Sequence, residues 1–207
     1  LSQLIRKIFS ETLQTVALAD VYKQMAWRLH ILDYFLNYAM RNKIKGAYVE
    51  CGVFRGFKSF FLFLKNEELL KDCDKYLFDT FAGIDVNYSD GSPISPSEHN
   101  KDGLYEFVLR RFKKFNRTKI IKGSVPDSLL SSDISEVSFL HLDMNSWQAE
   151  VGALDFFLPK MSTNSVIILD DFGLKTHKSQ MEHEMPFLRE KGYSILELPT
   201  GQGVVLI

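Results

Sequence analysis

The sequence predicts an α/β fold with helices on both faces of a mostly parallel, seven-stranded sheet. Short apolar segments typical of strands alternate with segments of helical periodicity from residue 47 onward. The runs at 139–142 and 166–169 are apolar enough to be central strands buried on both faces. Only five residues separate the last two predicted strands, too few for a parallel crossover, so the sheet should end in an antiparallel hairpin.

The first 45 residues are predicted to form a helical extension. Apolar residues recur there at helical spacing, and neither glycine nor proline occurs before Gly46. Asp20 is a favourable N-cap, so we expect two helices that divide near it. The chain is therefore divided into an extension, residues 1–45, and a sheet-bearing domain, residues 46–207. The extension would serve as a cap over a site or as a homodimer contact, and the sequence leaves both alternatives open.

The elements of the second domain follow in chain order. The predicted strands are 47–52, 75–78, 119–122, 137–142, 165–169, 193–198 and 204–207, and the predicted helices are 57–70, 104–115, 149–161 and 181–191. Pro186 would kink the last helix or mark its true beginning. Residues 83–102 are a polar stretch rich in Gly, Ser, Pro, Asp and Asn, and a loop of this length is expected to cover a site or to be disordered.

Composition excludes several classes of protein. With 207 residues, of which 45% are hydrophobic and 25% charged, the chain is typical of a globular domain. Its net charge of -1 argues against a dedicated nucleic-acid binder. Two cysteines are too few for a disulfide scaffold or a cysteine zinc site. We see no membrane-spanning run and no signal peptide, so we expect a cytoplasmic protein without a membrane partner.

A glycine-containing turn follows the first predicted strand, where open α/β sheets bind ligands. Phe54 stands in this turn where a dinucleotide-binding motif has the glycine that admits a pyrophosphate. S-adenosylmethionine has no phosphate and tolerates the bulkier loop. Glu50 could face the ammonium group of S-adenosylmethionine. The carboxylate of S-adenosylmethionine could bind at the helix N-terminus with help from Arg55, Lys58 or Ser59. The alternative is a tight turn with solvated charges.

Polar residues also follow the second and third predicted strands. Asp79 could accept hydrogen bonds from both hydroxyls of a ribose, although it lies 29 residues after Glu50, farther than usual. A turn or helix cap is the alternative for Asp79. Ser124 and Val125 could flank an adenine ring, while the same segment could also hold an N-cap residue.

Three carboxylates form the strongest local signal. Asp143 ends the fourth predicted strand, and Asp170 and Asp171 end the fifth. A right-handed crossover places these strands side by side, so the carboxylates should converge and repel each other unless a cation or a proton intervenes. Oxygen ligands suit Mg²⁺ or Ca²⁺, and Asn145 and Glu150 are near enough in sequence to contribute. Capping of backbone amides is the alternative.

The histidines give weaker signals. His141 lies inside a predicted strand and is expected to be a hydrogen-bonded core residue. His99, His177 or His183 could act as a general base, with a solvated side chain as the alternative for each.

Five segments carry a resemblance to a known family. In order they are residues 48–56 (YVECGVFRG), 76–83 (YLFDTFAG), 123–129 (GSVPDSL), 141–145 (HLDMN) and 167–173 (IILDDFG). This series resembles the macrocin O-methyltransferase (TylF/MycF-like) family, over roughly residues 45–207. The family belongs to the Rossmann-like class I methyltransferases, whose parallel strands also end in an antiparallel hairpin.

The resemblance implies Mg²⁺-dependent transfer of a methyl group from S-adenosylmethionine to a hydroxyl of a small acceptor, often a sugar or glycosylated metabolite. On this analogy the cofactor-binding residues are Glu50, Gly52, Val53, Arg55, Gly56, Ser59, Asp79, Thr80, Phe81, Gly123, Ser124, Val125 and Asp143. The metal ligands would be Asp143, Asp170 and Asp171. The catalytic candidates are Asp143, Asn145 and Glu150.

One departure from the family pattern bears on this expectation. The usual signature after the fourth strand is Asp-x-Asp, whose second Asp is a metal ligand and proposed base, whereas this chain has Asn145. Asn can ligate a metal through its carbonyl but cannot take a proton. Either Asp143 or Glu150 completes the site, or the metal is weak or absent. The rival functions are a divergent or non-catalytic S-adenosylmethionine-binding module and a nicotinamide-dependent reductase; Phe54 and the hairpin argue against the second.

Overall fold

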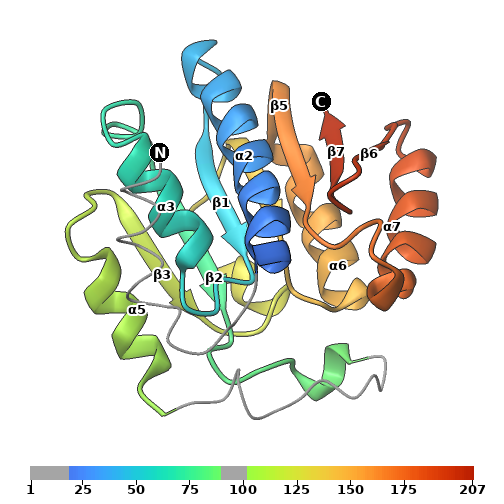
Figure 1. The fold of residues 1–207 in the computed structure, drawn as a ribbon, viewed down its shortest axis with the longest axis horizontal. Coiled ribbons are helices and arrows are strands. Elements are labelled where there is room, and N and C mark those ends of the chain that lie inside the picture. Colours follow the sequence, from blue (N-terminus) through green and yellow to red (C-terminus); the bar gives the residue numbers. More distant parts are fainter. Residues whose placement is uncertain (1–18, 90–101) are drawn as a thin grey trace.

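The computed structural model describes residues 19–89 and 102–207, with side chains described from residue 25 onward. Seven strands form one sheet in the order β3-β2-β1-β4-β5-β7-β6 (Figure 1). The strands are β1 (Ala47–Cys51), β2 (Lys75–Asp79), β3 (Thr118–Lys122), β4 (Val137–Leu142), β5 (Met161–Leu169), β6 (Leu196–Glu197) and β7 (Gly203–Leu206). β1 to β5 pair in parallel, and β7 pairs antiparallel with both β5 and β6. The predicted sheet with its terminal antiparallel hairpin is confirmed.

Helices cover both faces of this sheet. They are α2 (Ala19–Arg41), α3 (Phe57–Lys65), α5 (Leu104–Phe112), α6 (Trp147–Phe157) and α7 (Lys178–Glu190). Figure 1 shows α2 and α3 in front of the sheet and α6 behind it. Successive strand residues point to opposite faces, so Phe139 packs in the core beneath α2, α3 and α5, and Leu140 in the core beneath α6 and α7. Within the described ranges, the structure holds no helix both long and apolar enough to cross a membrane.

α2 belongs to the front helical layer. Leu29, Leu32 and Leu36 are almost fully buried in the same apolar cluster as Phe139 of β4. Asp20 lies within α2 rather than in front of it, so it is not the N-cap of this helix. Residues 1–18, where the first predicted helix falls, lie outside the described residues. The role of residues 1–45 as a cap or a dimer contact stays a prediction.

Several elements begin or end at residues other than those predicted. α3 ends at Lys65 rather than residue 70, because Asn66 turns the chain: its side-chain amide donates to the carbonyl of Leu62 at 3.0 Å and to Asp33 Oδ1 at 2.9 Å. α5 ends at Phe112 rather than at residue 115. β5 begins four residues earlier than predicted, at Met161. Pro186 lies inside α7 and neither begins nor ends it.

Candidate active site

A cavity of about 290 Å³ lies at the carboxyl ends of β1, β2, β3 and β4. All the predicted cofactor-binding residues line it except Gly56, Ser59 and Phe81. Asp143 and Asn145 also line it, whereas Glu150 does not. The structure therefore has a cavity at the edge of the sheet where the sequence predicts that a ligand binds.

Gly52 brings the loops after β1 and β4 into contact. Its φ is +94°, and a Cβ added there would lie 2.0 Å from the carbonyl oxygen of Asp143. The amide of Asp143 in turn donates to the carbonyl of Cys51 at 2.9 Å. Only glycine combines this backbone conformation with so close an approach.

Asp79 joins the loops after β1 and β2. Its Oδ2 accepts the backbone N–H groups of Val53 and Phe54, both at 2.7 Å, and its Oδ1 accepts that of Phe81 at 2.6 Å. The carboxylate thus fixes the shape of two cavity walls. A carboxylate offers about four lone-pair sites, so acceptor capacity remains for one further donor from the cavity.

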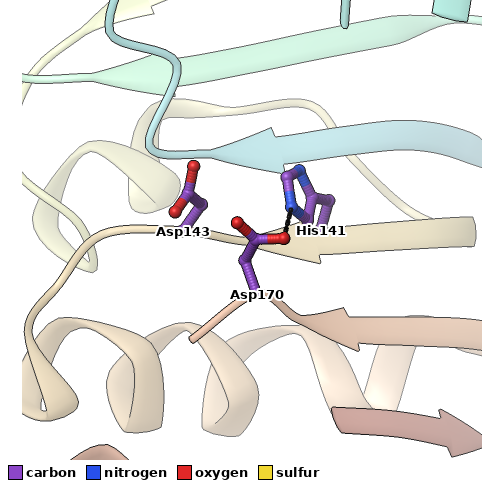
Figure 2. Close-up of side chains that lie close together, drawn as sticks. All are labelled: His141, Asp143 and Asp170. Carbon is purple, nitrogen blue, oxygen red and sulfur yellow. Dashed lines mark ion pairs between the residues drawn. The ribbon is translucent and has the colours of Figure 1, made fainter. Parts of the chain in front are cut away.

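A buried chain of charged groups runs beneath the cavity, across three strands. Glu50 Oε1 lies 3.0 Å from His141 Nδ1, and His141 Nε2 lies 3.4 Å from Asp170 Oδ1 (Figure 2). Ser59 donates its hydroxyl to the other oxygen of Glu50. Burial lowers the pKa of His141, but the two facing carboxylates outweigh burial and raise that pKa to about 9. His141 is therefore a core residue, as predicted.

Asp143 and Asp170 lie close together, and two basic side chains contact them and the adjacent Asp171. Lys58, from the first turn of α3, contacts Asp143 Oδ2 at 2.5 Å and also contacts Asp170. Arg28 of α2 lies 2.7 Å from Asp170 Oδ2 and 2.5 Å from Asp171 Oδ1. The predicted carboxylate cluster is thus a network of partly buried ion pairs.

The pKa values of these carboxyl groups diverge. Burial raises the pKa of Asp143 to about 7, although Lys58 opposes the shift. Burial would also raise the pKa of Asp170, but Lys58, His141 and Arg28 together hold it well below its ordinary value. Asp143 lines the cavity, while Asp170 is 1% exposed and lies behind it. The two carboxylates therefore differ in accessibility and in charge environment.

Glu150 faces away from the cavity. Its Oε1 accepts the backbone N–H of Met144 at 2.9 Å and the side-chain amide of Gln180 at 2.8 Å. Its carboxyl group also interacts electrostatically with that of Glu184 on α7, and both residues are buried. Burial raises the pKa of Glu150 well above its ordinary value, and that of Glu184 to about 7. Glu150 thus fixes the loop after β4 rather than facing the cavity as a catalytic group would.

The described part of the long polar stretch borders the cavity. Ile84, Asp85 and Tyr88 line it. Asp85 accepts the hydroxyl of Ser124, and the phenol of Tyr88 donates to Asp127 Oδ1 at 2.9 Å. Residues 83–89 therefore cover one side of the site, as expected of a loop of this kind, while 90–101 lie outside the described residues.

The other candidate histidines do not face the cavity. His183 stacks on Trp147, with ring centroids 3.7 Å apart. His177 Nδ1 lies 4.0 Å from Asp171 Oδ2. Neither lines the cavity, and His99 lies outside the described residues.

Two residues of the network carried no recognisable signal in the sequence. Gln202, in the turn between β6 and β7, donates to Asp170 Oδ1 at 2.8 Å. Arg28 interrupts the apolar pattern of α2, but this pattern does not indicate which residues the Arg28 side chain contacts. Lys58, considered as a partner of a cofactor carboxylate, lies instead between Asp143 and Asp170.

Two curated relatives are O-methyltransferases. One is the 8-demethyl-8-(2,3-dimethoxy-alpha-L-rhamnosyl)-tetracenomycin-C 4'-O-methyltransferase of Streptomyces olivaceus, 22% identical over 71% of this chain and 60% of that protein. The other is the mycinamicin III 3''-O-methyltransferase of Micromonospora griseorubida, 24% identical over 70% of this chain and 62% of that protein. The chain thus spans about three fifths of the length of the curated relatives it matches.

Solved structures with a similar fold are also methyltransferases. The calicheamicin methyltransferase CalS11 superposes with a TM-score of 0.71 at 12% identity, over 99% of this chain and 91% of that one. The O-methyltransferase NovP gives a TM-score of 0.69 at 17% identity, over 86% and 78%. These similarities establish the class I methyltransferase fold. Residues 15–191, most of the chain, match the family model of the macrocin O-methyltransferases (TylF), and the chain therefore belongs to that family.

Proposed function

We propose that this protein is an S-adenosylmethionine-dependent O-methyltransferase whose acceptor is a hydroxyl of a sugar or glycosylated small molecule. The observation that carries the proposal is the cavity at the carboxyl ends of the parallel strands, bordered by Asp143, in a chain of this family. The two curated relatives are named for rhamnosyl and mycinamicin substrates, which supports the acceptor class.

The cavity has the groups that S-adenosylmethionine requires. Its volume of about 290 Å³ is near the lower end of the range for small-molecule pockets, roughly 300–1,000 Å³. Asp79 retains acceptor capacity for a ribose hydroxyl, and Glu50 places a negative charge in the wall for the ammonium group. Phe54, Val125 and Met144 supply apolar wall for the adenine and the methylene groups.

The chemistry requires alignment and removal of one proton. The cofactor supplies an electrophilic methyl group: its carbon bonds to the acceptor oxygen while the carbon–sulfur bond breaks and that electron pair stays on sulfur. Among the three predicted catalytic residues, Asp143 is the one carboxylate on the cavity wall, and it takes the proton of the acceptor hydroxyl. Asn145 borders the same cavity and can hydrogen-bond the acceptor but cannot take its proton. Residues 84–88 exclude water from one side.

Calorimetric titration with S-adenosylhomocysteine tests the cofactor site. We expect the wild type to bind with micromolar affinity and Asp79→Asn to bind about tenfold more weakly or worse, because a hydrogen bond to a charged group contributes roughly 1.5–3 kcal/mol. Asp133→Asn is the control: this exposed carboxylate pairs with Lys119 at 2.7 Å, near the opposite ends of the strands. Absence of binding in the wild type would contradict the proposal.

Methylation of acceptors tests the reaction itself. The wild type is incubated with S-adenosylmethionine and a panel of rhamnosylated metabolites and their aglycones, and products are identified by mass spectrometry. We expect methylation of the glycosylated compounds only, and a loss of about a hundredfold or more in turnover in Asp143→Asn, within the range for removal of a general base. Methylation of the aglycones alone would refute the sugar acceptor, and unchanged turnover in Asp143→Asn would refute the base.

A further inference from the structure

The donor set expected to hold Mg²⁺ is already bonded to groups of the protein. Asp170 Oδ2 contacts both Lys58 and Arg28, and its Oδ1 accepts from Gln202 at 2.8 Å and faces His141 at 3.4 Å. Lys58 also contacts Asp143 Oδ2 at 2.5 Å. Mg²⁺ requires close to octahedral coordination by oxygens at roughly 2.0–2.1 Å. Such an ion would have to displace the ammonium group and the amide together.

The electrostatic balance also disfavours a divalent ion. Arg28 and Lys58 are two cations within the same network of carboxylates. His141 Nδ1 lies 3.0 Å from Glu50 Oε1, and its Nε2 lies 3.4 Å from Asp170 Oδ1, so both ring nitrogens face carboxylates of the protein. Asp171 pairs with Arg28 and lies outside the group formed by His141, Asp143 and Asp170, whose candidate ligand atoms lie within 4.8 Å of one another (Figure 2). The residues therefore do not fit the expected metal.

We propose that the ammonium group of Lys58 takes the place of the divalent cation, so that this enzyme binds and activates its acceptor without a metal. The inference rests on the proposed methyltransferase function. Lys58 lines the cavity beside Asp143, so its charge lies at the acceptor's end of the site.

The ammonium group has a donor left for the acceptor. Of its three N–H groups, one reaches Asp143 and one reaches Asp170, and none of the other described residues accepts the third. That N–H donates to the acceptor oxygen while the proton of the acceptor hydroxyl passes to Asp143. The positive charge of Lys58 stabilises the negative charge that develops on the acceptor oxygen. Asp170, Arg28 and His141 hold Lys58 in place from behind and do not touch the acceptor.

A Mn²⁺ titration tests the inference. The protein is first dialysed against a chelator, and Mn²⁺ binding is then measured by electron paramagnetic resonance. We expect no binding by the wild type at millimolar Mn²⁺. Lys58→Ala removes the competing cation and exposes two carboxylates, and we expect its affinity for Mn²⁺ to rise by about tenfold or more. Lys65→Ala is the matched control, because Lys65 lies on the same helix and pairs with Asp33 at 2.5 Å, away from the cavity.

Stoichiometric micromolar Mn²⁺ binding by the wild type, abolished by Asp170→Asn, would overturn the inference. This measurement does not depend on the folding of Lys58→Ala. Titration of the same wild-type sample with S-adenosylhomocysteine separates the two proposals. Binding of both S-adenosylhomocysteine and Mn²⁺ refutes only the role of Lys58, whereas absence of S-adenosylhomocysteine binding refutes the proposed function and that role with it. Once an acceptor is known, methyl transfer by the wild type should be unchanged by the chelator.

Discussion

At the scale of single residues, the site depends on close approaches that leave no room for a larger side chain. Gly52 lies where the turn after β1 meets the backbone of Asp143, and Asp79 fixes that turn through the amides of Val53 and Phe54. Hydrogen bonds and close contacts of the backbone therefore help to hold the two loops in place. A change of one methyl group at Gly52 should disturb both the cofactor site and the position of Asp143.

Gly52→Ala tests this tightness. The new Cβ would lie 2.0 Å from a backbone oxygen at a φ of +94°, so strain and overpacking should together cost about 3 kcal/mol of unfolding free energy. Gly192→Ala is the control, because Gly192 has a similar φ of +88° but nothing within 4 Å of an added Cβ. It should lose only about 1 kcal/mol. Urea denaturation measures both, and equal losses would show that the contact with Asp143 is unimportant.

At the scale of elements, α6 and α7 meet through a buried pair of carboxyl groups. Glu150 of α6 and Glu184 of α7 are 1% and 0% exposed, and their carboxyl groups act on each other, so ionisation of both would bury two like charges together. Asp171 and His183 are the other charged groups that act on Glu184. The attachment of α7 to α6, and with it the loop that carries Asn145, should depend on pH.

The sign of this dependence follows from the raised pKa of Glu184, about 7 in the folded protein. The folded state binds the proton more tightly than the unfolded state, so the stabilisation is complete below about pH 4.5 and is lost as the pH rises through about 7. We expect thermal unfolding to show a loss on the order of 3 kcal/mol between these limits. Glu184→Gln should flatten the profile and exceed the wild type in stability at about pH 8.

Glu182→Gln is the control on the same helix, because Glu182 is exposed and pairs with Lys178 at 2.9 Å. It should leave the pH profile within about 0.5 kcal/mol of the wild type. If the stability of the wild type does not change with pH across this range, the pair formed by Glu150 and Glu184 does not hold a proton in the folded protein.

At the scale of the whole molecule, the parallel sheet brings residues from distant parts of the sequence to one edge. Asp79 ends β2, Asp143 follows β4 and Asp170 follows β5, so all three lie at the carboxyl edge of the sheet. The helical layer then adds groups from outside this edge: Arg28 reaches Asp170 from α2, and Lys58 reaches it from α3. The order of the strands positions the acidic residues of the network. The packing of α2 and α3 positions its two basic residues, Arg28 and Lys58.

The sequence alone determined the alternation of strands and helices, the terminal hairpin and the acidic residues at the ends of the second, fourth and fifth strands, because periodicity and the topology of parallel sheets are local or nearly local properties. It could not determine where α3 ends, because a long-range contact of Asn66 with Asp33 decides it. Nor could it show that Lys58 and Arg28 lie among the carboxylates. Only the tertiary structure decided this, since no local pattern encodes which side chains of packed helices face which strand ends, and charges buried together must be paired.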